Sequence, residues 1–146
     1  MFSSTSEITI ARPIDDVFAY ISHLENDSLW CPEVKSATPL DESPPGVGKK
    51  YDLVARPIPM DQHGGYEIVE FEPPSHMKIR LWQDTSKGET WYRLEETEAG
   101  TRLIYKTEVN VGGIGKWFEP MIGWMTTRSR GPRMLRNLKK ILEAET

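Results

Sequence analysis

The sequence predicts an α+β fold that combines an antiparallel sheet of about seven strands with a long C-terminal helix. Three observations lead to this prediction. A strand pattern near the N-terminus is followed by two short helical patterns, six strand patterns with short links come next, and a helical period closes the chain. Consecutive strands with short links form antiparallel meanders. Because 146 residues suit one domain and no internal repeat is visible, residues 1–146 are expected to form a single domain.

The first strand and both short helices are expected in the first thirty residues. Ser3–Ala11 alternates apolar and polar positions, which indicates a strand. Pro13 suits the first turn of a helix, and apolar residues follow at helical spacing over residues 14–24. A second short helical turn is expected at Asp27–Trp30, where a proline soon follows.

The middle of the chain is predicted to form strands, and its C-terminal part is predicted to form a helix. Two prolines and two glycines make Arg56–Gly65 a predicted long loop. Glycines at 112, 113 and 115 interrupt the strand pattern, and a helical period then runs from Lys116 to Ala144. The six strands are expected at Glu33–Leu40, Lys50–Ala55, Gly65–Glu72, His76–Gln83, Glu89–Glu96 and Thr101–Val109.

Composition removes several classes of function. A net charge of −4 argues against a general nucleic-acid binder. Cys31 is the only cysteine, so no intrachain disulfide or thiolate metal cluster is expected. His23, His63 and His76 match no metal motif, and no phosphate-binding loop of recognised spacing occurs, so no metal or cofactor is expected. No apolar run is long enough to span a bilayer and no signal peptide is visible, which favours a cytoplasmic protein.

Strand alternation predicts which side chains face inward. On the last strand Leu103 and Tyr105 share one face, and Tyr92 on the strand before it is expected to point the same way. The segment Tyr66–Glu72 stays ambiguous, because both of its faces mix apolar and acidic residues. The same reasoning turns Met77, Ile79, Leu81, Tyr51, Leu53 and Ala55 inward and turns Trp82 and Trp91 outward.

Several segments of the chain carry a family resemblance. They are Ile10–Ile21 followed by Trp30, Tyr66–Pro74, Tyr92–Leu94, Gly100–Leu103 and Leu135–Glu143. In this order the chain resembles the polyketide cyclase/dehydrase and lipid-transport family of the START-like (SRPBCC) helix-grip superfamily. The resemblance implies a single START-like domain whose curved sheet wraps around the long C-terminal helix and leaves an apolar cavity between them. Members include cyclases, dehydratases, hydrolases, hormone receptors and lipid carriers, so the fold does not fix the function.

The expected function is binding of an apolar small molecule or lipid in this cavity, as a carrier or sensor. Five Trp, five Tyr and four Phe supply large rings for its walls. Each candidate could also simply pack in the core, and Arg128 could instead pair with a carboxylate or reach solvent. The candidate ligand-binding residues are Trp30, Tyr51, Leu53, Leu81, Tyr92, Leu103, Tyr105, Trp117, Met121, Met125 and Arg128.

Two alternatives stay open. One is a cyclase, dehydratase or hydrolase that works inside the same cavity, and the other is an interaction module with an incidental cavity. An inward carboxylate near Tyr92 or Tyr105 would favour the enzyme, because burial raises the pKa of a carboxyl into the range of acid–base chemistry. An exposed tryptophan patch would favour the interaction module. No residue is assigned as catalytic, although the polar candidates are Tyr92, Tyr105, Glu67, Glu70 and Arg128.

Positive charge gathers near the C-terminus. Residues 116–140 hold seven Lys or Arg and one acid, Glu119. Such runs are usually solvated helix faces, but they also suit an anionic surface. The sequence therefore leaves open a transient contact with an anionic membrane or an acidic partner, for a monomer or a homodimer.

Overall fold

The computed structural model describes residues 2–58, 60–83, 86–111 and 131–144. It begins with strand β1 (Phe2–Ile10), helix α1 (Ile14–Ser22), the 3-10 turn η1 (Leu24–Asn26) and the short helix α2 (Asp27–Trp30). Six strands follow, and the described chain ends in helix α4 (Gly131–Ala144). The six strands are β2 (Val34–Pro39), β3 (Lys50–Ile58), β4 (Met60–Glu72), β5 (His76–Gln83), β6 (Ser86–Thr97) and β7 (Gly100–Val111).

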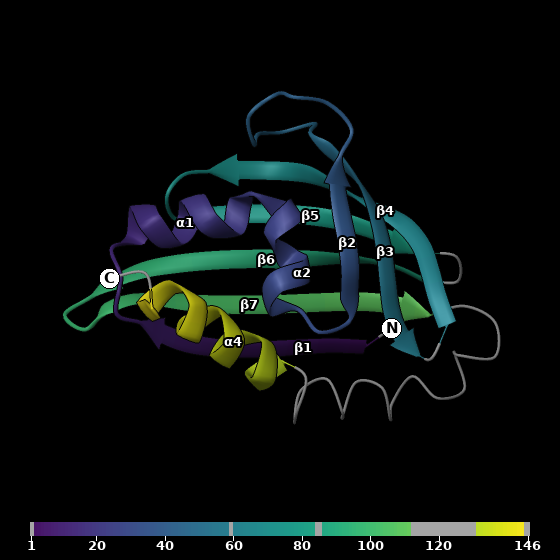
Figure 1. The fold of residues 1–146 in the computed structure, drawn as a ribbon. Coiled ribbons are helices and arrows are strands. Elements are labelled where there is room, and N and C mark those ends of the chain that lie inside the picture. The colour runs from purple at the N-terminus through teal and green to yellow at the C-terminus, as the bar shows by residue number, and fades with distance from the viewer. Residues whose placement is uncertain (1, 59, 84–85, 112–130, 145–146) are drawn as a thin grey trace.

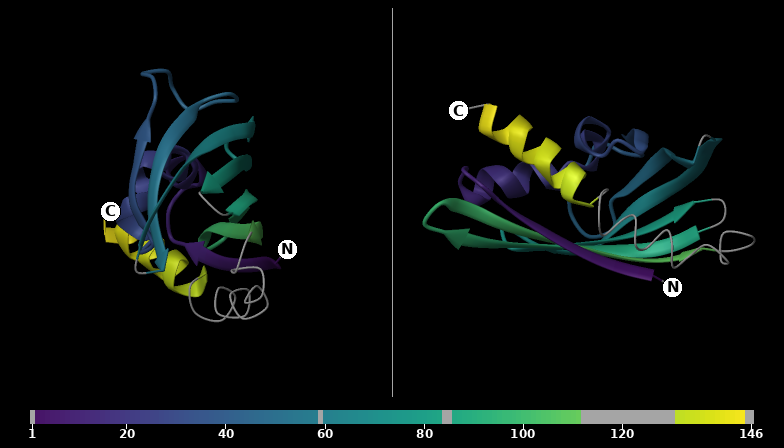
Figure 2. Two further views of the ribbon diagram at one scale, coloured as in Figure 1. Left: turned by 90° about the vertical axis from the view of Figure 1, so that its right-hand side faces the viewer. Right: turned by 90° about the horizontal axis from the view of Figure 1, so that it is seen from below.

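All seven strands form one antiparallel sheet in the order β1-β7-β6-β5-β4-β3-β2. The sheet is strongly curved, and α1, α2 and α4 all lie on its concave side (Figures 1 and 2). The predicted α+β architecture is therefore confirmed, with seven strands and a helix at the C-terminal end of the described chain. Of the predicted helix at Lys116–Ala144, only residues 131–144 are described.

The predicted long loop at Arg56–Gly65 is wrong. Strand β3 continues to Ile58, and β4 begins at Met60, so the two strands form a hairpin. The ladder between them shifts register after Ala55, and Pro57 falls in that irregular stretch, where a missing N–H breaks no regular pairing. Glycine suits position 65 because the Trp82 ring of β5 packs over it. A Cβ at this position would lie 2.6 Å from the nearest atom of that ring.

A β-bulge explains the mixed faces of Tyr66–Glu72. The pairing of β4 with β5 shifts between Ile68 and Glu70, so one residue is added at that point. Tyr66 and Ile68 are buried before the bulge, and Phe71 faces inward after it, with its ring 5.4 Å from that of Phe18. Strict alternation cannot describe a strand whose parity changes midway.

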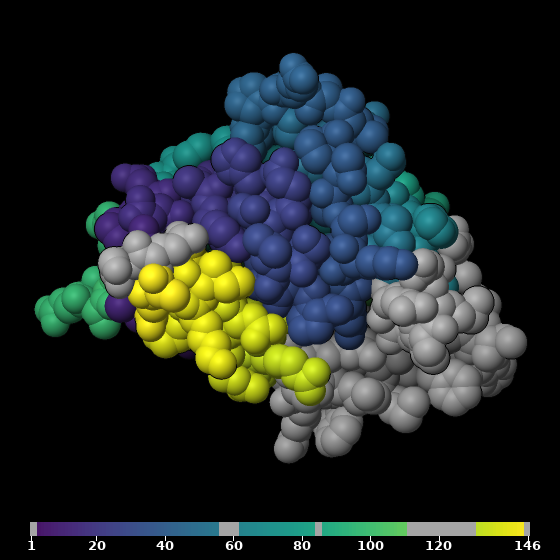
Figure 3. Space-filling view, viewed as in Figure 1, coloured from purple at the N-terminus to yellow at the C-terminus, as the bar shows by residue number. Residues whose placement is uncertain are grey.

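Helix α4 packs against the N-terminal part of the chain. Leu135, Leu138 and Leu142 recur at helical spacing and are fully buried against β1 and α2. The Lys139 ammonium donates to the Thr9 carbonyl oxygen at 2.6 Å, and the Arg12 guanidinium donates to the Leu142 carbonyl oxygen at 2.7 Å. On the face shown in Figure 3, α4 lies directly beside α2.

No described helix has the length and apolar character that crossing a membrane requires.

Candidate ligand-binding site

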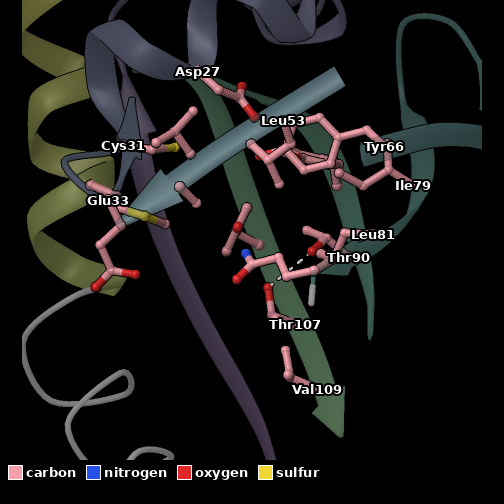
Figure 4. A pocket seen from close by; sticks show the side chains of 16 residues that line it. Asp27, Cys31, Glu33, Leu53, Tyr66, Ile79, Leu81, Thr90, Thr107 and Val109 are labelled. Atoms are coloured by element: carbon pink, nitrogen blue, oxygen red, sulfur yellow. Dashed lines mark hydrogen bonds between the residues drawn. The ribbon is translucent and has the colours of Figure 1, made fainter. Parts of the chain in front are cut away.

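A cavity of about 150 Å³ lies between the inner face of the sheet and the helical side of the domain (Figure 4). Its wall draws on α2, on strands β2 to β7 and on the start of α4, so elements far apart in the sequence are needed to build it. The described residues that line it are Asp27, Cys31, Glu33, Val34, Leu53, Ala55, Tyr66, Ile79, Leu81, Gln83, Thr90, Tyr92, Tyr105, Thr107, Val109 and Met134.

Strand alternation produces the apolar part of this wall. Ile79 and Leu81 are two residues apart on β5, and Leu53 and Ala55 are two residues apart on β3. Such pairs project from the same face of a strand, which here is the concave one. The inward faces expected from the sequence for these two strands agree with the structure.

Four predicted site residues lie on the cavity wall. They are Leu53, Leu81, Tyr92 and Tyr105. Tyr51 and Leu103 are buried in the core but are not among the described lining residues. Four other predicted residues lie outside the described part of the chain, namely Trp117, Met121, Met125 and Arg128.

Trp30 packs behind the wall and does not form part of it. Its side chain is 1% exposed, and its ring meets the Tyr105 ring edge to face with centroids 6.2 Å apart. The Asn137 amide of α4 donates to the Trp30 carbonyl oxygen at 3.3 Å. Trp30 thus anchors α2 between the sheet and α4, which is a packing role.

Glu67 and Glu70 face away from the cavity. Glu67 alternates with the buried Tyr66 and Ile68, and the bulge that follows places Glu70 on the same outer face. There the Glu70 carboxylate accepts a hydrogen bond from the His76 ring at 2.9 Å and lies 3.5 Å from the Lys78 ammonium. Glu67 and Glu70, which were polar candidates from the sequence, are therefore not among the described lining residues.

The acid that does face the cavity is Asp27, which the sequence reading missed. It lies in α2, is 2% exposed, and projects toward Tyr66 (Figure 4). A signal existed, because Leu24, Asp27 and Trp30 recur every three residues and so place an acid between two core residues on one helical face. An ionisable side chain in an otherwise apolar helical stripe is uncommon.

The environment of Asp27 keeps its proton in place at neutral pH. Burial raises the pKa of Asp27 from its ordinary value near 3.8 to about 8. A hydrogen bond with the Tyr66 hydroxyl acts in the opposite direction, and the nearby Glu25 carboxylate raises the pKa further. The carboxyl group therefore spends most of its time neutral at pH 7.

The phenols and the thiol on the wall are also held neutral. Burial is the main cause that raises the pKa values of Tyr66, Tyr92 and Tyr105. Burial likewise raises the pKa of the Cys31 thiol, and Asp27 and Glu33 raise it further when they are ionised. A thiol in this state is a poor nucleophile. The described wall thus offers neutral O–H groups on an apolar surface.

Two threonines add a polar spot at the far side of the cavity. The hydroxyl oxygens of Thr90 and Thr107 lie 3.2 Å apart on neighbouring strands and share a hydrogen bond (Figure 4). No Lys, Arg or His belongs to the described lining, and no group of three or more His, Cys, Asp or Glu in the described chain is arranged to hold a metal ion. The described site is suited to a molecule without charge.

A curved antiparallel sheet that holds helices and a cavity on its concave side defines the helix-grip class of domain. Within that class, the chain belongs to the polyketide cyclase/dehydrase and lipid transport family, whose model matches residues 1–143. The family expected from the sequence is thus confirmed, and family and fold are consistent with a ligand-binding domain.

Solved structures share the fold across the whole chain at low sequence identity. A START superfamily protein from Mycobacterium smegmatis has a TM-score of 0.82 at 15% identity, with 100% of both chains covered. TTHA0849 from Thermus thermophilus has a TM-score of 0.81 at 16% identity, with 99% of each chain covered. Protein NE0264 from Nitrosomonas europaea has a TM-score of 0.71 at 13% identity, covering 99% of this chain and 96% of the other. No curated protein matches the chain in sequence.

Proposed function

We propose that this protein binds a small, uncharged, largely apolar molecule in the cavity between the sheet and the helices, as a carrier or sensor. The observation that carries the proposal is the cavity wall, where Leu53, Ile79 and Leu81 surround a few neutral polar groups. Small-molecule sites typically combine an apolar lining with a small number of polar groups that set orientation.

The size of the cavity narrows the ligand class. A cavity on the order of 150 Å³ accepts about one aromatic ring. The enclosed part of the ligand is therefore ring-sized, and an extended lipid chain would not fit within it. This favours a compact ligand over a long acyl chain, both of which the family resemblance allowed.

Ethylbenzene is a suitable first probe because it has the required size and no polar group. Titration followed by NMR should shift methyl signals of Leu53, Ile79 and Val109 and saturate at one molecule per chain. Ala55→Phe fills the cavity and should weaken binding at least tenfold, whereas Ala99→Phe makes the same change at an exposed turn and should not. Absence of saturable shifts in the wild-type protein would contradict the proposal. If ethylbenzene binds, mass spectrometry of molecules extracted from purified protein would identify the natural ligand.

A second candidate function is acid–base catalysis in the same cavity, and the position of Asp27 favours it. A buried carboxyl whose pKa is about 8 can donate its proton to a substrate oxygen near neutral pH and accept one back. Dehydration and cyclisation both need such a step. Recovery of the extracted ligand unchanged after prolonged incubation supports a carrier, whereas conversion that stops in Asp27→Asn supports an enzyme.

An interaction module based on exposed tryptophans has less support. Trp82 covers Gly65, and the Trp91 ring lies under the ammonium groups of Lys78 and Lys106 at 4.9 and 5.2 Å from its centroid. Both tryptophans are half-buried on the outer face of the sheet and are occupied by neighbours within the chain. They do not combine into an open apolar patch.

A further inference from the structure

One oxygen of the Asp27 carboxyl group is buried without a partner. Oδ1 has no hydrogen-bond partner in the structure, although the residue is only 2% exposed and lines the cavity. Buried polar atoms are nearly always hydrogen-bonded, so an exception on a cavity wall points to something that enters the cavity.

The hydrogen-bonding role of the Asp27 carboxyl group follows from its neighbour. The Tyr66 hydroxyl influences the pKa of Asp27 through hydrogen bonding, and it keeps its own proton because burial raises the pKa of Tyr66. The phenol is therefore a donor toward the carboxyl group. The neutral carboxyl group in turn carries one O–H that can donate to a molecule in the cavity.

Among the described residues, the titratable groups that interact with Asp27 are all acids. Burial of the Asp27 carboxyl is the largest influence on its pKa, and these groups come from several surrounding elements. They are Glu25 of η1, Cys31 after α2, Tyr51 of β3, Tyr66 of β4, Tyr92 of β6 and Tyr105 of β7. Glu33 is a further acid on the cavity wall. None of these groups can serve as a counter-cation for a ligand carboxylate, and the Glu25 carboxylate would repel one.

We propose that this cavity selects a neutral carbonyl compound whose oxygen accepts a hydrogen bond from the carboxyl O–H of Asp27. The proposal rests on the proposed binding function and specifies its ligand class. A carbonyl oxygen supplies the acceptor that the buried donor lacks, and it brings no hydrogen that needs a partner of its own. A buried neutral carboxyl held as a hydrogen-bond donor by an apolar site is an established device in proteins.

Three probes of nearly equal shape test the proposal, namely acetophenone with a carbonyl, ethylbenzene without oxygen, and benzoate with a charge. At pH 6.5 the wild-type protein should bind the first two and reject benzoate. Asp27→Leu removes the donor and should lower the affinity for acetophenone about tenfold, whereas the affinity for ethylbenzene should change by less than a factor of about three. Asp27→Asn keeps a neutral N–H donor and should retain the wild-type affinity for acetophenone.

Two further readouts report on the hydrogen bond itself. The infrared carbonyl stretch of bound acetophenone should fall in frequency in the wild-type complex and return toward its free value in Asp27→Leu. Acetophenone affinity should drop as the pH rises past about 8, where Asp27 loses its proton, and should stay constant in Asp27→Asn.

The outcomes separate the two proposals. If ethylbenzene binds while acetophenone shows neither a carbonyl shift nor dependence on residue 27, the ligand class is wrong and the binding function stands. If no probe binds, the binding function itself fails. Should Asp27→Leu not fold, the carbonyl shift of the wild-type complex at pH 6.5 and pH 9 decides the question, because only an Asp27 hydrogen bond makes that shift pH-dependent.

Discussion

The rings of Tyr92 and Tyr105 meet edge to face at the floor of the cavity, with centroids 5.3 Å apart and an angle of 79° between their planes. The two residues are direct partners in the ladder between β6 and β7. Trp30 extends the contact from the helical side, so three aromatic rings connect α2 to strands β7 and β6. Aromatic pairs with this geometry contribute beyond the area that they bury.

Energetic coupling between these two tyrosines is the first prediction. A double-mutant cycle with Tyr92→Leu and Tyr105→Leu, measured by urea unfolding, should give a coupling free energy of about 1 kcal/mol. The pair Tyr92→Leu and Thr97→Ala serves as a control, because Thr97 is exposed at the far end of β6 and should show additive effects. Strict additivity for Tyr92 and Tyr105 would mean that the two rings pack independently.

Asp27 should make the protein less stable as the pH rises. Its pKa is raised from 3.8 to about 8 by folding, so the native state binds a proton more tightly than the unfolded chain over this range. Stability conferred by that proton is complete below about pH 4 and is lost progressively up to about pH 8. Asp27→Asn should therefore melt at nearly the wild-type temperature at pH 4 and several degrees above it at pH 8.5, a gain of a few kcal/mol at most.

The same measurement on Asp52→Asn provides the matched control. Asp52 is an exposed residue of β3, so its replacement should not produce a stability difference that grows between pH 4 and pH 8.5. A constant offset between Asp27→Asn and wild type across this range would show that Asp27 is ionised in the folded protein.

Gly64 should be intolerant of any side chain. A Cβ at this position would lie 1.7 Å from the Trp82 carbonyl oxygen, which is backbone and cannot rotate away. We expect Gly64→Ala to cost roughly 2–4 kcal/mol in denaturant unfolding, because β4 and β5 must separate locally. Gly46→Ala is the control, since its nearest atom would be 4.0 Å away, and it should change stability by less than about 0.5 kcal/mol. Equal stability of the two variants would refute this account of the strand contact.

The described part of α4 carries a cationic stripe that can be tested for surface binding. Arg133, Arg136 and Lys140 are exposed and recur at intervals of three and four, whereas Lys139 is engaged by Glu143. We predict co-sedimentation with anionic vesicles at low salt, loss of binding at moderate salt, and no binding to neutral vesicles. Changing the three residues to Glu should abolish binding to anionic vesicles at low salt.

A charge-matched variant distinguishes a specific stripe from net charge alone. Lys50→Glu, Lys87→Glu and Arg93→Glu together make the same change in charge at exposed positions of the sheet. This variant should keep vesicle binding. Equal loss in both variants, or no binding by the wild-type protein, would identify the stripe as ordinary solvated surface.

Much of the fold was predictable because it depends on local patterns. His76–Gln83 was placed at its observed bounds, and the inner faces of β3 and β5 follow from alternation alone. The wrong prediction of a loop at Arg56–Gly65 and the ambiguous faces of Tyr66–Glu72 share one cause, which is irregular register. The shift after Ala55 and the bulge at Val69 depend on how two strands meet, and neither strand records this in its own sequence.

The site was harder to predict than the fold for a different physical reason. Tyr92 and Tyr105 were found because a long strand shows its parity over many residues. Asp27 was missed because α2 has only four residues, so the one signal of its buried face was its spacing of three residues from Leu24 and from Trp30. Its function-relevant property, a neutral carboxyl, arises from burial by elements distant in sequence.

The contacts that join α4 to residues 9–12 also set the order in which the molecule can complete its fold during synthesis. Ala11 donates from its backbone to Glu143, and Arg12 to the Leu142 carbonyl oxygen, across separations of 132 and 130 residues. A ribosome must therefore deliver the chain as far as Glu143 before the apolar concave face can be covered at this end. Until then the nascent sheet presents uncovered apolar surface, so the arrival of α4 also completes its protection against aggregation.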